Sequence, residues 1–193
     1  MKLLLYCTKA KPYLYKTEDT TYPAYPIGYH VDKYLKVKLS NTNELANLNG
    51  KIVAECDFEV DKLTNCGTSF MIMKYDDLRE SYRYTNKVAR GSCLDYTDLR
   101  RYLGTKDGYA IHIKNLHIFD KPKELSEYLN NKYWNSHFGN DKVSKAPQNM
   151  MYVELDDIKY VLISIRPEWL CKILNGEKTI ECRKRILKEM MPK

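Results

Sequence analysis

Three charged side chains between positions 178 and 183 have the types and the spacing to bind an anion or to carry out acid–base chemistry. They are Lys178, Glu181 and Arg183, and they follow the turn-forming dipeptide Asn175-Gly176. Alternate residues of a strand share a face, so Glu181 and Arg183 are predicted to form an ion pair within one strand. The carboxylate would fix the guanidinium fork, which then presents donors to a phosphate or a base edge. The same pattern also fits a solvated strand face with a weak salt bridge.

The elements that would position these side chains are a strand, a short helix and a turn. Residues 161–165 form an apolar run that is typical of a buried strand. Pro167 suits the first position of a helix, and Gly176 suits the position just beyond its end. The basic strand at 178–183 then follows, with its odd-numbered residues on one face.

The run from Gly176 to Arg183, Gly-Glu-Lys-Thr-Ile-Glu-Cys-Arg, matches the Gly-x-Lys-x-x-Glu-x-Arg signature of the ASCH family. Residues 162–174 resemble the first strand and helix of that family. ASCH domains are similar to the PUA superfamily of small barrels, which is associated with RNA recognition. The resemblance implies an α+β fold, in which a small PUA-like mixed or antiparallel β-barrel carries short helices. The uneven succession of strands and short helices also favours a small barrel.

Most of the chain resembles later parts of the same family, in particular of its phage-borne members, but in a rotated order. Residues 2–9 look like the strand that normally follows the signature. Further segments follow in family order, at 50–55, 92–94, 109–116 and 145–148. We therefore predict one circularly permuted ASCH domain over residues 1–193, in which 161–193 supply the first strand, the helix and the signature strand. Chain termini often lie close together, which is why permutation is tolerated.

Two other arrangements of residues 161–193 remain open. They could dock on a neighbouring molecule, which would make the protein a swapped homodimer in place of a monomer. They could also be the stub of a truncated second module, which would leave the barrel incomplete.

The resemblance implies a basic cleft that binds RNA or a nucleotide. The signature strand would contribute Lys178, Glu181 and Arg183 to this cleft. The adjoining strand would contribute Tyr6, Thr8 and Lys9, and Ser92 would lie near the rim. Tyr6 could stack on a base, as aromatic residues do in single-strand binders, or it could be a core tyrosine.

The leading functional prediction is an RNA- or nucleotide-binding protein that leaves its ligand unchanged. The first alternative is a hydrolase of RNA or of a modified nucleoside, with Lys178 stabilising developing charge and Glu181 acting as general base. Similar amidohydrolases have a threonine nucleophile where this chain has Glu181, so we assign no catalytic residue. The second alternative is a phage-encoded regulator that binds a host protein or a ribonucleoprotein through the Tyr/Pro-rich segment at 12–30.

The composition is compatible with an anionic partner. The net charge is +7, and short basic clusters occur at Lys87 and Arg90, at Arg100 and Arg101, and between 178 and 188. Only folding could merge these clusters into a patch. The 17 tyrosines offer flat surfaces with polar tips, which suit wet interfaces, although a low-GC genome would also enrich tyrosine.

The six cysteines are scattered, without a Cys-x-x-Cys pair or paired histidines, so we predict no metal site and no cofactor. The apolar run at the start is too short for a secretory signal, and no run approaches the roughly 20 apolar residues that span a bilayer. We expect a protein of a reducing cytoplasm, that of a bacterial cell, with no membrane partner.

The remaining pattern predicts further elements. Prolines interrupt residues 10–48, which we expect to be a long loop or an insertion. Alternation predicts a strand at 51–60, with Ile52, Ala54, Cys56 and Phe58 on one face. Strands are also predicted at 108–119, at 150–155 and around Tyr160. A helix is predicted at 76–88. A second helix is predicted to begin with Asp95 or Thr97 as its cap and to end at Leu103. A third is predicted from Asp120 onward, where Pro122 and Glu124 would form the first turn.

Overall fold

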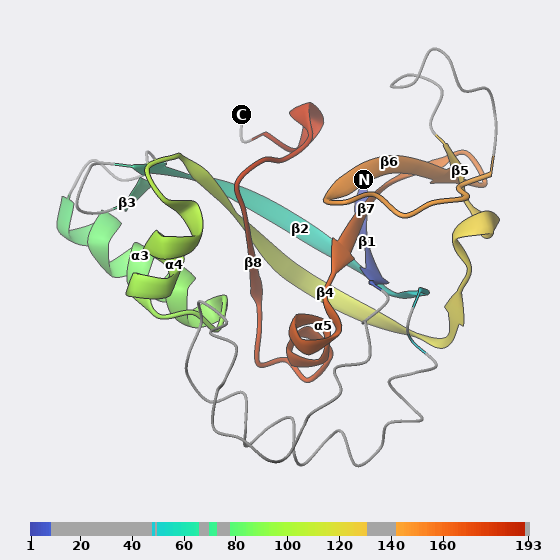
Figure 1. Ribbon diagram of the computed structural model, residues 1–193, viewed down its shortest axis with the longest axis horizontal. Helices are drawn as coiled ribbons and strands as arrows, with labels where there is room; N and C mark the ends of the chain where they lie inside the picture. Colours follow the sequence, from blue (N-terminus) through green and yellow to red (C-terminus); the bar gives the residue numbers. More distant parts are fainter. Residues whose placement is uncertain (9–47, 49, 66–69, 73–77, 131–141, 192–193) are drawn as a thin grey trace, which may run out of the picture.

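The computed structural model describes residues 1–8, 48, 50–65, 70–72, 78–130 and 142–191. These residues form an α+β structure, in which a single mixed sheet carries short helices (Figure 1). The α+β class is therefore confirmed. The loop or insertion predicted at 10–48, which contains the Tyr/Pro-rich segment, lies outside the described residues apart from Leu48.

In chain order, the strands are β1 (Lys2–Cys7), β2 (Ile52–Asn65), β3 (Phe70–Ile72), β4 (Gly108–Lys123), β5 (Leu129–Asn130), β6 (Met150–Leu155), β7 (Ile158–Ile165) and β8 (Ile180–Arg183). The helices are α3 (Leu78–Gly91), α4 (Tyr96–Leu103) and α5 (Pro167–Leu174), with short 3-10 turns η2 (Leu125–Glu127) and η3 (Lys188–Met190). The predicted bounds of α5 and β6 agree with the structure.

Both ends of the sequence belong to the same sheet. The strand order is β5-β6-β7-β1-β2-β4-β8, and β3 pairs with β2 outside this path. The first strand, β1, lies between β7, to which it is parallel, and β2, to which it is antiparallel. The signature strand β8 pairs with the start of β4. Residues 161–193 are thus built into the sheet, although β2 and β4 lie between β1 and β8.

The strands β2 and β4 are longer than the sequence pattern predicted, and they connect the two halves of the molecule. They have 14 and 16 residues, and their ladder runs from the pair Ile52 and Lys123 to the pair Leu63 and Gly108. Strands of this length twist strongly. Figure 1 shows them running diagonally between α3 and α4 at one end and β5, β6 and β7 at the other.

Apolar clusters on both faces of the sheet hold the elements together. On one face, Leu3 and Leu5 of β1 pack in a cluster with Leu170 of α5. On the other face, Leu4 and Tyr6 of β1 belong to a second cluster. This alternation follows from the period of two along a strand, and it makes β1 the most deeply buried strand of the described sheet.

A third cluster lies under the two helices α3 and α4. Val88 of α3 and Leu99 and Leu103 of α4 pack there against Ile180 and Cys182 of β8. The helix α4 begins as predicted, because the side chain of Asp95 accepts a hydrogen bond from the amide of Asp98 and caps the first turn. These two helices thus cover one face of the signature strand.

Two predictions about local structure are wrong. The helix predicted from Asp120 is the last part of β4, which includes Pro122, followed by η2. Proline is tolerated in this stretch because the β8 ladder lies on the first residues of β4, which leaves the final part paired with β2 alone. The residue Ile52 does not share a face with Ala54, because the ladder shifts register between them.

Candidate functional site

The signature strand is held between the end of α3 and the start of β4. The amide of Thr179 donates to the carbonyl of Gly91 at 2.9 Å, and the carbonyl of Thr179 accepts from the amide of Ile113 at 2.9 Å. A Cβ at Gly91 would lie 2.8 Å from the Cδ1 atom of Ile180, so a larger residue here would force that side chain to shift. The helix and the strand are therefore closely packed at this point.

Lys178 is a buried cation with a full set of partners. Its side chain is 4 % exposed, and its Nζ donates to the carbonyls of Ser92 and Ile180, both at 2.8 Å. The Nζ also lies 3.2 Å from Oε2 of Glu181. Two of the three N–H groups are thus hydrogen-bonded to carbonyls, and the carboxylate of Glu181 balances the charge. Ser92 follows the last residue of α3, where the negative end of the helix dipole favours a positive charge.

Glu181 joins Lys178 to Arg183, and Arg183 extends the network to the opposite strand. Oε1 of Glu181 lies 2.9 Å from Nε of Arg183, which makes an ion pair without hydrogen-bond geometry at that nitrogen. The two terminal nitrogens of Arg183 donate to Oδ1 of Asn149 at 3.0 Å and to the carbonyl of Ser164 at 2.7 Å. The guanidinium thus bridges β8 to β7 and to the residue that precedes β6.

The indole of Trp169 covers this network on the side of α5. The Nζ atoms of Lys178 and Lys172 lie 5.3 Å and 5.0 Å from the centre of its rings. Cations at such distances are attracted by the ring quadrupole. The signature side chains therefore form a largely enclosed charge network, in which Arg183 is 15 % exposed.

A groove next to this network lies between α3, β4 and β8. It has a volume of about 550 Å³ and is lined by Asn86, Lys87, Arg90, Gly91, His112, Ile113, Lys114, Thr179 and Ile180. Among these described residues, the lining contains lysine, arginine and histidine but no carboxylate. The nearest acidic partners lie on β2, where Asp61 is 2.9 Å from His112 and the largely exposed Glu59 is 2.5 Å from Lys114. The pair of Lys114 and Glu59 is exposed, so it neutralises little of the charge of the groove, whereas His112 and Asp61 are both largely buried.

Comparison of the chain with protein-family models, with curated proteins and with solved structures finds no match. The assignment to the ASCH family therefore stays a prediction. It is based on the signature and on the segments that resemble the family.

The structure brings four of the predicted site residues together and places the others elsewhere. Lys178, Glu181 and Arg183 form the charge network, and Ser92 contributes its main-chain carbonyl while its hydroxyl donates to the carbonyl of Ala89. Ser92 is fully buried, so it does not lie on a rim.

The residues predicted from the adjoining strand are not part of this network as described. Tyr6 is 6 % exposed and packs in the core, and burial raises the pKa of its hydroxyl. The amide of Thr8 donates to the carbonyl of Ile165, beside the start of α5. Lys9 lies outside the described residues.

Reasoning from the sequence missed two residues of this region, Lys114 and Tyr102. Lys114 belongs to an alternating pattern that predicts a strand, and this pattern alone gave no sign of a site. The same alternation places Lys114 on the strand face of His112. Tyr102 belongs to the helix α4, whose buried positions are Leu99 and Leu103. The signal available in the sequence was an aromatic residue next to this buried stripe.

Among the described residues, no group of three or more histidine, cysteine, aspartate or glutamate side chains is arranged to hold a metal ion. No helix in this part of the chain has the length and apolar character needed to cross a membrane.

Proposed function

We propose that this protein binds RNA or a nucleotide and holds phosphate groups in the groove between α3, β4 and β8. The observation that carries the proposal is the lining of the groove, where Lys87, Arg90 and Lys114 converge from two elements. Clustered cations of this kind attract phosphates and release their counterions. The volume of about 550 Å³ is in the range of pockets that bind small ligands.

In this proposal, the signature residues shape the groove and do not contact the phosphate. Lys178 ties the end of α3 to β8 through the carbonyls of Ser92 and Ile180, and the groove lies between these same two elements. The side chain of Lys178 is only 4 % exposed and its ammonium contacts protein groups, so it is not accessible to a phosphate. This arrangement supports binding without chemical change over a hydrolase that uses Lys178 and Glu181.

We further propose that the sheet closes as a PUA-like barrel in a circularly permuted ASCH domain. The resemblance to the ASCH signature supports this arrangement, as do the hydrogen bonds of Arg183, which span from β8 to Ser164 of β7. Side-chain contacts of this type hold strands together where no main-chain ladder joins them.

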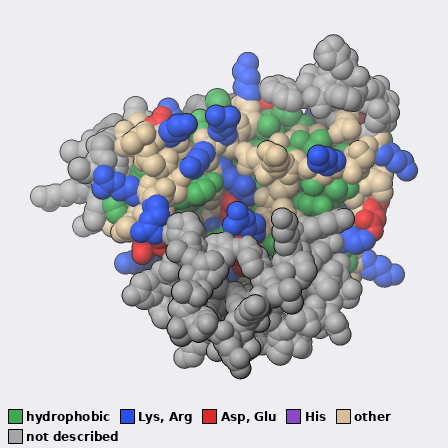
Figure 2. Space-filling view, in the orientation of Figure 1, with side chains coloured by type: hydrophobic (Ala, Val, Ile, Leu, Met, Phe, Trp, Pro, Cys, Tyr) green, Lys and Arg blue, Asp and Glu red, His purple; other side chains and the backbone are tan. Residues whose placement is uncertain are grey.

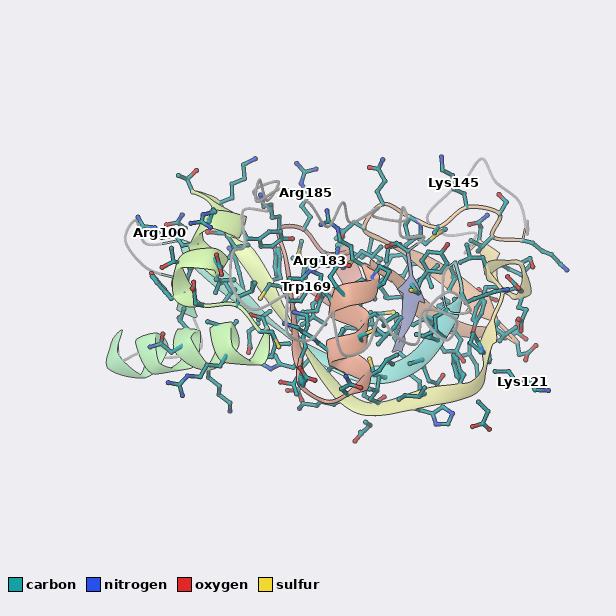
Figure 3. The ribbon with its side chains drawn as sticks, turned by 60° about the horizontal axis from the view of Figure 1, so that its bottom comes forward. Arg100, Lys121, Lys145, Trp169, Arg183 and Arg185 are labelled. Atoms are coloured by element: carbon teal, nitrogen blue, oxygen red, sulfur yellow. The ribbon has the colours of Figure 1, made fainter. Side chains whose placement is uncertain are left out.

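The test is a binding titration of the full-length protein with fluorescently labelled RNA and, separately, with a labelled mononucleotide, at several salt concentrations. Binding is expected to weaken as salt rises, and Arg90→Ala is expected to weaken it further and to lower the salt slope by about one. Lys121→Ala is the matched control, since Lys121 is exposed near the far end of β4 (Figure 3).

The recovered RNA is analysed on a denaturing gel after each titration. Intact RNA together with an effect of Arg90→Ala supports the proposal. Absence of binding at low salt, or equal binding by the Arg90 and Lys121 variants, would overturn it. Cleavage that disappears in Glu181→Gln would favour the hydrolase instead.

A further inference from the structure

Among the tyrosine, phenylalanine and tryptophan residues whose side chains the structure describes, Tyr102 is the exposed one, and 37 % of its surface is accessible. It lies at the end of α4, next to Leu103, which is buried. The accessible part of the ring offers a flat surface with a polar tip, on which a ligand can stack.

The surroundings of Tyr102 are basic. The Nζ of Lys184, just beyond β8, lies 5.2 Å from the centre of its ring. The charges of Arg183 and Arg166 act on its hydroxyl, although burial against the neighbouring elements is the larger influence and raises the pKa of Tyr102. Figure 2 shows several lysine and arginine side chains over α4 and β8 on this face of the molecule. We call Tyr102, Arg166 and Lys184 the Tyr102 patch.

We propose that the Tyr102 patch stacks a base of single-stranded RNA on the ring of Tyr102. The base takes the place of the Lys184 ammonium over the ring, and Lys184 and Arg166 then contact phosphates. This inference rests on the proposed function and narrows its ligand to a single strand. In a duplex, both faces of each internal base are already stacked, so a protein ring can reach only unpaired bases. Exposed cations around an aromatic platform are the usual arrangement of single-strand binders.

The position of the patch relative to the groove supports the same ligand. Thr179 lines the groove, and Arg183, which acts on Tyr102, lies four residues further along the same strand. Four residues of a strand span about 13 Å. Stacked nucleotides rise about 3.4 Å each, so a segment of about four nucleotides covers this length. One short single strand can therefore occupy the groove with a phosphate and the patch with a base.

The experiment compares a single-stranded RNA oligonucleotide with a blunt duplex of the same sequence, using the full-length protein and fluorescence anisotropy. Tyr102→Ala is expected to weaken binding of the single strand about 5- to 150-fold and to leave the duplex unchanged. Tyr102→Trp is expected to retain single-strand binding, because the ring is kept. Ile158→Ala removes an exposed apolar side chain elsewhere and serves as the control.

The outcomes separate this inference from the proposed function. If Arg90→Ala weakens binding but Tyr102→Ala has no effect, or if Tyr102→Ala weakens single strand and duplex equally, the stacking inference is overturned and the groove proposal stands. If the protein binds neither RNA but binds the labelled mononucleotide, the stacking inference alone is overturned, and if it binds none of the three ligands, both are overturned. A thermal melt of each variant shows whether it is folded, and the Tyr102→Trp variant still tests the inference if Tyr102→Ala does not fold.

Discussion

The ammonium of Lys178 lies 2.8 Å from the carbonyl oxygen of Ser92, although 86 positions separate the two residues in the sequence. This contact joins the signature segment to the end of α3 and places a cation at the negative end of that helix. The same helix and strand form two walls of the basic groove. The charge network and the groove are therefore coupled through the position of α3.

Replacing Lys178 by methionine is expected to lower the free energy of unfolding by about 3 kcal/mol. The substitution leaves two buried carbonyls and one oxygen of Glu181 without their donor, and breaking a buried ion pair in this way is strongly destabilising. Urea unfolding followed by circular dichroism measures the change. Lys145→Met, at an exposed position, should change it by less than about 0.5 kcal/mol. A loss of similar size in both variants would contradict the role assigned to Lys178.

Replacing Arg183 by alanine is expected to loosen the connection between β8 and β7. The variant loses hydrogen bonds from a charged group to Asn149 and to Ser164, each worth about 1.5–3 kcal/mol. Hydrogen exchange should speed up at the amide of Ser164, which donates to the carbonyl of Asn149. Arg185→Ala is the control, since this exposed side chain lies nearby (Figure 3). Unchanged exchange in the Arg183 variant would contradict the bridge.

Replacing Gly91 by alanine is expected to destabilise the protein by about 1–3 kcal/mol, because the new methyl group would overlap the side chain of Ile180. Ile180→Val removes the Cδ1 atom that lies closest, so the double variant should be more stable than the sum of the single changes predicts. Chemical unfolding of the four proteins gives this coupling energy. Strict additivity would mean that the helix and the strand can separate at no cost.

The stability of the protein is expected to fall as the pH rises above about 9. Burial raises the pKa of the Cys182 thiol from 9.0 to about 11, and burial likewise raises the pKa of Cys56 to about 12. Between pH 9 and these raised pKa values, the thiols ionise in the unfolded chain but stay neutral in the folded one. The unfolded state is therefore stabilised as the pH rises, and the free energy of unfolding falls. Below pH 9 the stabilisation is fully present.

The measurement is the urea concentration at which half of the protein is unfolded, determined at several pH values between about 7 and about 10.5. The double variant Cys56→Ala and Cys182→Ala should show a flatter decline above pH 9 than the native sequence, even if its midpoint at pH 7 is lower. An identical decline in both proteins would show that other groups cause it.

Local structure near the signature could be predicted well from the sequence. Pro167 and Gly176 mark the two ends of α5, and alternation along β8 separates Glu181 and Arg183 from Ile180 and Cys182, as the structure confirms. These features depend on contacts between residues that are close in the sequence, so local rules suffice. The helix predicted from Asp120 shows the limit of such rules, because pairing with β2 outweighs the helix-start signal of Pro122.

The sequence by itself determined which residues are available to the site, namely short basic clusters along the chain and one Lys-x-x-Glu-x-Arg pattern on a short strand. Only the tertiary structure decided that Lys178 is enclosed by two carbonyls and the carboxylate of Glu181, and that Lys87, Arg90 and Lys114 line a groove together. The physical reason is that burial and hydrogen-bond partners depend on contacts between residues far apart in the chain. Spacing within one strand fixes the face of a side chain, but the packing of α3 against β8 fixes whether that face meets solvent or protein.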